Sequence, residues 1–189
     1  PAAPPEAPAP ARRRIPFTGM RGSIARNLTA AWQAPRVAVG LELDLTATMA
    51  RLEALRAGAE RPRPTLTAMV VRAAALALRA HPGVNALVGE DGVELADGVH
   101  IAVAVSLDDG LVTPVIRDAD QKSVQAIAGE IASLAGAARS GGLPPGALQG
   151  GTFTVSSLGA TGIDWFTPVL NPPQAAILGV GRVAERPVV

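Results

Sequence analysis

The spacing of apolar residues along this 189-residue chain switches repeatedly between the helical period and the alternating period of a β-strand. Helical spacing predicts helices over residues 18–34, 46–58, 65–81 and 124–138. Strand-like spacing predicts strands over residues 37–45, 99–107, 111–117, 151–158 and 175–183, with two shorter ones flanking Asp91–Gly92. Because helices and strands mix without a regular repeat, the predicted fold class is α+β, a mixed sheet flanked by helices.

The composition excludes several classes of protein. Hydrophobic residues make up 48% of the chain and charged residues 17%, which is enough apolar material for a packed core. No apolar run approaches the roughly 20 residues that span a bilayer, so we expect no membrane helix. The absence of cysteine excludes disulfides and thiolate chemistry and fits a reducing compartment. With a net charge of +1, 3% aromatic residues and one short basic run at 12–14, the chain is not expected to bind nucleic acid.

The first residues differ in composition from the rest of the chain. Residues 1–11 read PAAPPEAPAPA, a proline and alanine segment that favours extended, semi-rigid conformations and cannot bury a core. The apolar pattern of a folded domain begins at Ile15. We therefore expect a linker over residues 1–14 and one domain over residues 15–189.

The histidines and paired acids give weak signals for catalysis. His81 precedes a proline at a predicted helix end, and His100 begins an apolar strand, where a half-buried structural histidine is the simpler interpretation. Asp108–Asp109 and Asp118–Asp120 lie in predicted turns, where carboxylates commonly bond to the backbone. None of these residues has the local setting of a nucleophile, base or metal site, so no metal is expected.

A strand with three hydroxyls is the most informative local pattern. Within residues 151–158, Thr152, Thr154 and Ser156 share one strand face, and Phe153 and Val155 share the other. Hydroxyls are costly in a dry core unless each finds a partner. The pattern is equally consistent with a threonine ladder on a solvent face and with a hydroxyl directed into a cleft.

Four longer stretches carry a family resemblance. They read PFTGMRGSIARNLTAAW, TLTAMVVRAAALALRAHPGVNA, DGLVTPVIRDADQKSVQAIAGEI and LQGGTFTVSSLGATGIDWFTPVLNPPQAAILGVGR. In order and spacing they resemble the catalytic domain of the dihydrolipoamide acyltransferases of 2-oxoacid dehydrogenase complexes, across about nine-tenths of the chain. The resemblance implies a chloramphenicol-acetyltransferase-like fold. It also implies transfer of an acyl group, here expected to be acetyl, between a dihydrolipoyl thiol and coenzyme A.

The resemblance assigns roles to individual residues. Ser156 in TVSS occupies the position of the hydroxyl that donates to the oxyanion of the tetrahedral intermediate. Arg21 in GMR is equally consistent with a residue that holds the site's geometry by pairing with an acidic residue and with an ordinary surface arginine. Asn171–Pro172–Pro173 is expected to be a structural turn. Substrate contacts are expected at four further positions, Ser157, Thr154, Leu111 and Thr167.

One departure from the family pattern concerns the general base. The family's His-x-x-x-Asp-Gly motif is not found after Ser156, and neither His81 nor His100 aligns with it. We therefore expect the sequence to be truncated before that motif, lacking the catalytic histidine and a terminal strand and helix, and to be inactive alone. The alternative is a non-catalytic scaffold or assembly protein of the same fold.

The resemblance also implies partners. We expect a homotrimer that assembles into a larger core, served by a lipoyl group on a separate domain and by decarboxylase and dihydrolipoamide dehydrogenase components. Coenzyme A is expected as a substrate, and the expected compartment is the bacterial cytoplasm rather than the mitochondrial matrix.

Overall fold

The computed structural model describes residues 15–58 and 62–187, and the predicted linker at 1–14 lies outside these residues. The predicted α+β class is confirmed, and the predicted helices lie where their spacing places them. They are α1 (Gly19–Gln33), α2 (Thr46–Ala57), α3 (Leu66–Ala80) and α4 (Val124–Arg139), with two 3₁₀ turns, η1 (Ala119–Gln121) and η2 (Gly159–Thr161). None of the helices in the described part of the chain is long and apolar enough to cross a bilayer.

In the described part of the chain, eight short strands form one central sheet and two hairpins. The strands are β1 (Ala86–Val88), β2 (Val93–Leu95), β3 (Ile101–Val103), β4 (Val105–Leu107), β5 (Gly110–Val112), β6 (Val115–Ile116), β7 (Phe153–Ser157) and β8 (Ile177–Val180). The central sheet has the order β6-β3-β7-β8, in which β7 is parallel to both of its neighbours and β6 is antiparallel to β3. The antiparallel hairpins are β1-β2 and β4-β5.

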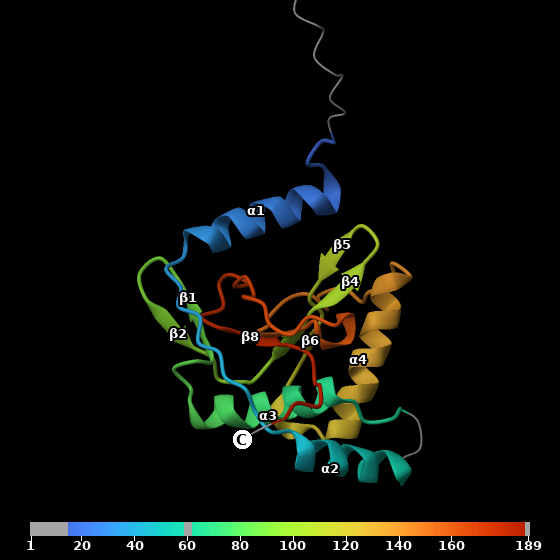
Figure 1. Ribbon diagram of the computed structural model, residues 1–189. Coiled ribbons are helices and arrows are strands. Elements are labelled where there is room, and N and C mark those ends of the chain that lie inside the picture. The colour runs from blue at the N-terminus through green and yellow to red at the C-terminus, as the bar shows by residue number, and fades with distance from the viewer. Residues whose placement is uncertain (1–14, 59–61, 188–189) are drawn as a thin grey trace, which may run out of the picture.

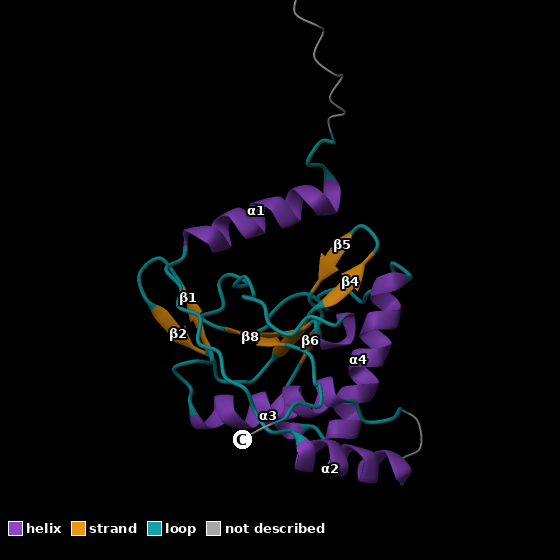
Figure 2. Cartoon of the chain, viewed as in Figure 1, coloured by secondary structure: helices purple, strands orange, loops and turns teal. Residues whose placement is uncertain are grey.

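The central sheet separates two different environments. On one face, α3 and α4 bury the main core, to which β7 contributes Phe153 and Val155. Figure 1 shows α1 on the far side of the sheet from α3, and Figure 2 shows loops filling the space between α1 and the sheet. The apolar layer therefore lies on the α3–α4 face, and the other face of β7 carries the polar side chains.

Helix α3 begins at a side-chain cap, and α1 does not. Thr65 Oγ1 accepts a hydrogen bond from the Ala68 backbone N–H at 3.1 Å, whereas the hydroxyl of Thr18 makes no capping bond to α1. A capping hydroxyl satisfies one of the backbone donors that a helix leaves unpaired at its start. The predicted start of α3 at Thr65 is thereby confirmed, down to the bond that defines it.

The predicted strand at residues 37–45 is wrong. The segment is extended but forms no strand, and residues 35–44 take part in no backbone–backbone hydrogen bond in the described part of the chain. Its alternate apolar residues, Val37, Val39, Leu41 and Leu43, are 70–90% exposed. The alternation is that of a strand with one buried face, but no neighbouring strand lies along it.

The predicted strands at 99–107 and 111–117 each divide in two. Residues 101–103 pair with β6 and β7 in the central sheet, whereas residues 105–107 pair only with β5 in a hairpin. Pro114, which cannot donate to a ladder, separates β5 from β6. Each apolar run therefore serves two different sheets, which its apolar spacing alone does not reveal.

Replacing Thr65 by Ala tests the cap of α3. Thr65→Ala should lower the free energy of unfolding by about 1 kcal/mol, because the Ala68 N–H loses its acceptor. Thr18→Ala is the matched control and should change it by less than half as much. Chemical denaturation of both variants measures the difference, and equal losses would contradict the assignment.

Candidate functional site

Along the polar face of β7, two hydroxyls form hydrogen bonds within the chain, and a third hydroxyl, which we call uncommitted, forms none. Thr152 Oγ1 accepts from the His100 backbone N–H at 3.0 Å, and Thr154 Oγ1 donates to Gln174 Oε1 at 2.5 Å. Both threonines are buried, so the solvent-facing threonine ladder is wrong. Ser156 is half-buried on the same face, and its hydroxyl has no hydrogen-bond partner among the described residues. On this face of the strand, Ser156 is therefore the hydroxyl that is free to bond a ligand.

Two amide side chains from the segment before β8 fix this face of β7. Gln174 donates through Nε2 to the Gly151 carbonyl at 3.0 Å and accepts from Thr154. Asn171 donates through Nδ2 to Thr154 Oγ1 at 3.3 Å. Asn171 does lie in the expected turn, but it also contacts β7, a role that sequence analysis missed. The Thr154 hydroxyl donates its proton within the chain. The predicted contact of Thr154 with substrate stays a prediction.

The loop after η2 passes over the face that Ser156 shares. Ser156 and Gly179 are register partners in the parallel pair β7-β8, so their side-chain positions point to the same face. A Cβ on Gly179 would lie 3.2 Å from both Phe166 and Pro168. Thr167, between them in sequence, is exposed. The structure thus brings the loop carrying Thr167 close to the Ser156 face.

A cavity of about 440 Å³ lies between α1, β5 and the segment before β8. We call it the α1–β5 cavity. Its polar lining consists of Ser23, Asn27, Thr113, Asn171 and Gln174, and no charged side chain of the described residues lines it. Its other lining residues are apolar or glycine: Met20, Ile24, Ala102, Leu111, Val112, Val115, Leu148, Gly150, Gly151, Pro172 and Pro173.

The predicted site residues reach this region to different extents. Leu111 lines the α1–β5 cavity, and Thr154 is one hydrogen bond away from it through Asn171. Ser156 and Thr167 are not among the residues that line the cavity. Ser157, exposed at the end of β7, lies on the opposite strand face from Ser156, so the two serines do not share one cleft on this strand.

Arg21 has an acidic partner, as one of its two interpretations requires. Its Nη2 lies 3.3 Å from Asp109 Oδ1 in the turn between β4 and β5, and both side chains are substantially exposed. The pair joins α1 to the hairpin that supplies Leu111, and both of these elements line the α1–β5 cavity. Exposed ion pairs contribute little to stability. The pair therefore matters for the position of α1 relative to the β4-β5 hairpin rather than for the free energy of unfolding.

Neither histidine is placed to act at Ser156. His81 ends α3, and its backbone N–H bonds to the Ala77 carbonyl. His100 is half-buried, and its Nδ1 accepts from the Asp118 backbone N–H at 3.0 Å. His100 bonds to Thr152, which is roughly 13 Å from Ser156 at 3.3 Å per strand residue. The described residues also contain no cluster of acids and histidines that could hold a metal ion.

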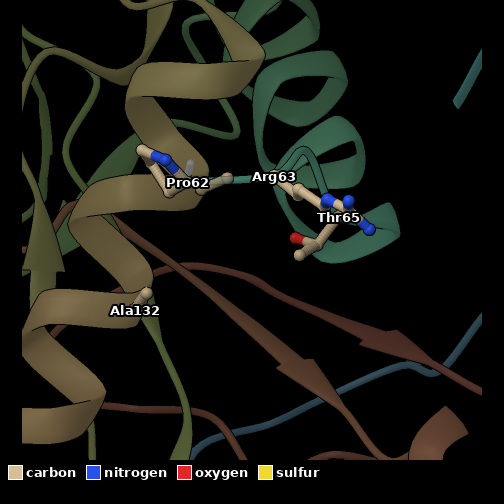
Figure 3. Close-up of a pocket in the computed structure, with 5 residues that line it drawn as sticks. Pro62, Arg63, Thr65 and Ala132 are labelled. Carbon is tan, nitrogen blue, oxygen red and sulfur yellow. The ribbon is translucent and has the colours of Figure 1, made fainter. Parts of the chain in front are cut away.

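A second hollow lies between α4 and the segment that leads into α3 (Figure 3). It is lined by Pro62, Arg63, Thr65, Ala128 and Ala132. The Thr65 hydroxyl is already bonded in the cap of α3. Arg63 is the one charged residue among those that line the hollow. This arrangement offers no donor and acceptor set for group-transfer chemistry.

An ionic cluster holds the chain after β8. Asp164 accepts from Arg182 Nε at 2.8 Å and lies 3.3 Å from Arg186, which also contacts Glu42 at 3.0 Å. The hydrogen bond from Arg182 lowers the pKa of the Asp164 carboxyl from its ordinary value of 3.8. The cluster ties the exposed segment at 37–45 to the loop that precedes Phe166.

The fold, with its parallel β3-β7-β8 core and uncommitted serine, is that of the acyltransferase cores of multienzyme complexes. The solved structures that it resembles include a dihydrolipoamide acetyltransferase from Azotobacter vinelandii, at a TM-score of 0.90 and 36% identity over 99% of this chain and 81% of that chain. The cubic core of the pyruvate dehydrogenase multienzyme complex matches with the same TM-score and coverage.

The family follows from the sequence comparison. The chain matches the model for 2-oxoacid dehydrogenases acyltransferase (catalytic domain) over residues 9–189, and it belongs to this family. It is 38% identical to the dihydrolipoyllysine-residue acetyltransferase component of the acetoin cleaving system of Bacillus subtilis, over 93% of this chain and 45% of that protein. It is 40% identical to the lipoamide acyltransferase component of the branched-chain complex of Pseudomonas aeruginosa, over 93% and 42%. The chain thus spans less than half the length of either relative.

Removing the Gln174 side-chain amide tests the network that fixes β7. Gln174→Leu should lower the free energy of unfolding by about 1–3 kcal/mol, because the buried Thr154 O–H would lose its acceptor and the Gly151 carbonyl its donor. Gln33→Leu, on the exposed side of α1, is the control and should have a much smaller effect. Calorimetry or chemical denaturation of both variants measures the two losses of unfolding free energy, and equal losses would contradict the role of the network.

Asp164 predicts a specific dependence of stability on pH. A carboxyl whose folded pKa is lowered contributes stability that is complete above its unfolded pKa, near 3.8, and is lost as the pH falls through the folded value. Asp164→Asn should therefore reduce stability at pH 6 and flatten its fall in acid. Asp97→Asn removes the same charge from an exposed residue without a described ion pair. Identical pH profiles for the two variants would count against the cluster.

Proposed function

We propose that this chain forms the acyltransferase core of a 2-oxoacid dehydrogenase complex, moving an acyl group between a dihydrolipoyl thiol and coenzyme A. The observation that carries the proposal is the uncommitted hydroxyl of Ser156, in a chain of this family, on a strand face where the other two hydroxyls are committed. Acetyl is the proposed acyl group, supported by relatives named as acetyltransferases.

Ser156 is the proposed oxyanion donor. When a thiolate attacks a thioester carbonyl, negative charge develops on the carbonyl oxygen. A hydroxyl fixed at that point stabilises the charge more in the transition state than in the ground state. The buried network around Thr154 holds β7 in place, so Ser156 is positioned before substrate arrives. A single donor of this kind is worth about 2.7–4 kcal/mol.

The thiol's proton requires an acceptor that the described residues do not place near Ser156. We propose that a histidine on another polypeptide segment takes this proton and completes the site. The Azotobacter vinelandii acetyltransferase supports this division of labour, because a serine, a histidine and an asparagine were investigated for roles in its catalytic mechanism. An expected consequence is little or no turnover by residues 1–189 alone.

The proposed substrate region joins the Ser156 face to the α1–β5 cavity. Leu111 contributes an apolar wall, and Arg21 braces α1 against the β4-β5 hairpin at Asp109. Thr167 lies on the loop over the Ser156 face, and Ser157 ends the same strand. Thr154 is proposed to position Asn171. The lipoyl group would be carried on a separate domain, and no metal takes part.

Assembly is proposed to follow the family. The apolar side chains of Phe17, Trp32, Val37, Val39, Leu41 and Leu43 are 69–90% exposed, which suits a surface that a partner covers. A homotrimer within a larger core, served by lipoyl-domain, decarboxylase and dihydrolipoamide dehydrogenase partners, would cover it. One structural relative is itself the cubic core of a multienzyme complex. The bacterial cytoplasm is the proposed compartment, supported by the bacterial relatives, although mitochondrial and chloroplastic relatives also exist.

The proposal is tested by joining Val189 to the histidine-bearing segment of the Azotobacter vinelandii acetyltransferase and measuring acetyl transfer from acetyl-coenzyme A to dihydrolipoamide. Ser156→Ala in this fusion should lower kcat by about 10²–10³ with little change in KM, because the hydroxyl acts on the transition state. Ser140→Ala, whose hydroxyl bonds only within its own turn, is the matched control.

Two outcomes would overturn the proposal. One is a Ser156→Ala fusion that retains full kcat. The other is a folded, assembled fusion that transfers no acyl group, a result that would favour the non-catalytic scaffold instead.

A further inference from the structure

We propose that Asn171 determines specificity in the α1–β5 cavity, where its Oδ1 accepts a hydrogen bond from an amide N–H of a neutral, thiol-bearing arm. This inference rests on the proposed acyl-transfer function and concerns how the arm is recognised rather than how the acyl group moves. It follows from the direction of the hydrogen bonds that connect the cavity to β7.

The direction of these hydrogen bonds is fixed at the buried end. The Gly151 carbonyl can only accept, so the Gln174 group that faces it must be the donor Nε2, at 3.0 Å. Gln174 therefore turns its acceptor Oε1 toward Thr154, which must give its one proton to it. The Thr154 oxygen is then left as an acceptor, and Asn171 must present Nδ2 to it. The relay leaves Asn171 Oδ1 as the unused acceptor.

Burial keeps the relay from reversing. Thr154 is 1% exposed and Gln174 is 5% exposed, so a flipped amide would leave a buried donor facing a donor or an acceptor facing an acceptor. Such a mismatch forfeits a hydrogen bond and the solvation of both groups. Asn171 itself is half-buried in the cavity wall, and no described residue donates to its Oδ1. The cavity therefore presents an acceptor whose orientation is set before any ligand arrives.

The lining of the cavity defines the class of ligand. Because none of the described residues that line it is charged, the cavity suits a neutral ligand and not a phosphate or carboxylate group. Its apolar walls suit methylene carbons, and an acceptor at Asn171 calls for an N–H or O–H donor. Both acyl-carrying arms of the proposed reaction have this chemistry, since the lipoyl-lysine arm and the pantetheine arm of coenzyme A are neutral thiols that contain amides.

The test compares ligands with and without the donor. Calorimetric titration of the full chain with N-methyl-dihydrolipoamide and N,N-dimethyl-dihydrolipoamide measures the preference for an amide N–H, and pantetheine tests the second source. The wild-type protein should bind the N-methyl compound up to about tenfold more tightly, the size of one net hydrogen bond. A stronger response to pantetheine than to either lipoyl probe would assign the cavity to coenzyme A instead, with Asn171 in the same role.

Variants separate recognition from folding. Asn171→Ala should abolish the preference for the N–H compound while retaining weak binding of both. Thr154→Val, which interrupts the relay but keeps the side chain's shape, should reduce the preference because Asn171 becomes free to rotate. Gln33→Ala lies outside the cavity and should keep the wild-type preference.

The outcomes distinguish this inference from the function on which it rests. Equal wild-type affinity for the two lipoyl compounds would overturn the role of Asn171 and leave the proposed function standing. A preference that survives in a folded Asn171→Ala protein would do the same. If none of the three probes binds, the cavity is not the substrate region, and the inference fails together with that part of the proposed function.

Discussion

The burial of hydroxyls on one face of β7 is the constraint on which the rest of the site depends. The other face of this strand belongs to the main core through Phe153 and Val155, so β7 cannot turn to bring its polar residues to solvent. Buried hydroxyls must then be satisfied by the chain itself. His100, Gln174 and Asn171 supply those partners, and in doing so they attach two distant segments to the strand. Ser156 is left half-buried in a position that those contacts fix.

The described ion pairs lie outside the lining of the α1–β5 cavity, which suits the proposed neutral ligand. Among the described residues, no ionisable side chain lines the α1–β5 cavity, whereas ion pairs join α1 to the β4-β5 turn and lie beside the loop before Phe166. With this lining, the choice of ligand depends on the polar groups of the cavity, such as the Asn171 amide. The Arg21–Asp109 pair and the Asp164 cluster act instead on placement. They connect α1 to its hairpin and the segment after β8 to the loop over the Ser156 face.

Sequence analysis predicted what is encoded locally. The start of α3 follows from Thr65, and the polar face of β7 follows from strand alternation. The strand at 37–45 was wrong because alternation reports which side chains seek burial, not whether a neighbouring strand exists. The runs at 99–107 and 111–117 divide because pairing partners come from elsewhere in the chain. Asn171 escaped detection because its role depends on Thr154, which is 17 residues away, and on a cavity wall supplied by α1. A glutamine three residues after it, directly before the apolar run of β8, was the available signal.

The central claim is that the hydroxyl of Ser156 faces the carbonyl oxygen on which charge develops during acyl transfer. A crystal structure of the assembled protein with a stable tetrahedral analogue of the thioester adduct tests this most directly. The account predicts Ser156 Oγ at about 2.7–3.1 Å from the analogue's oxyanion oxygen, with the attached arm running toward Asn171. An analogue bound well away from β7, with the Ser156 side chain turned to solvent, would contradict it.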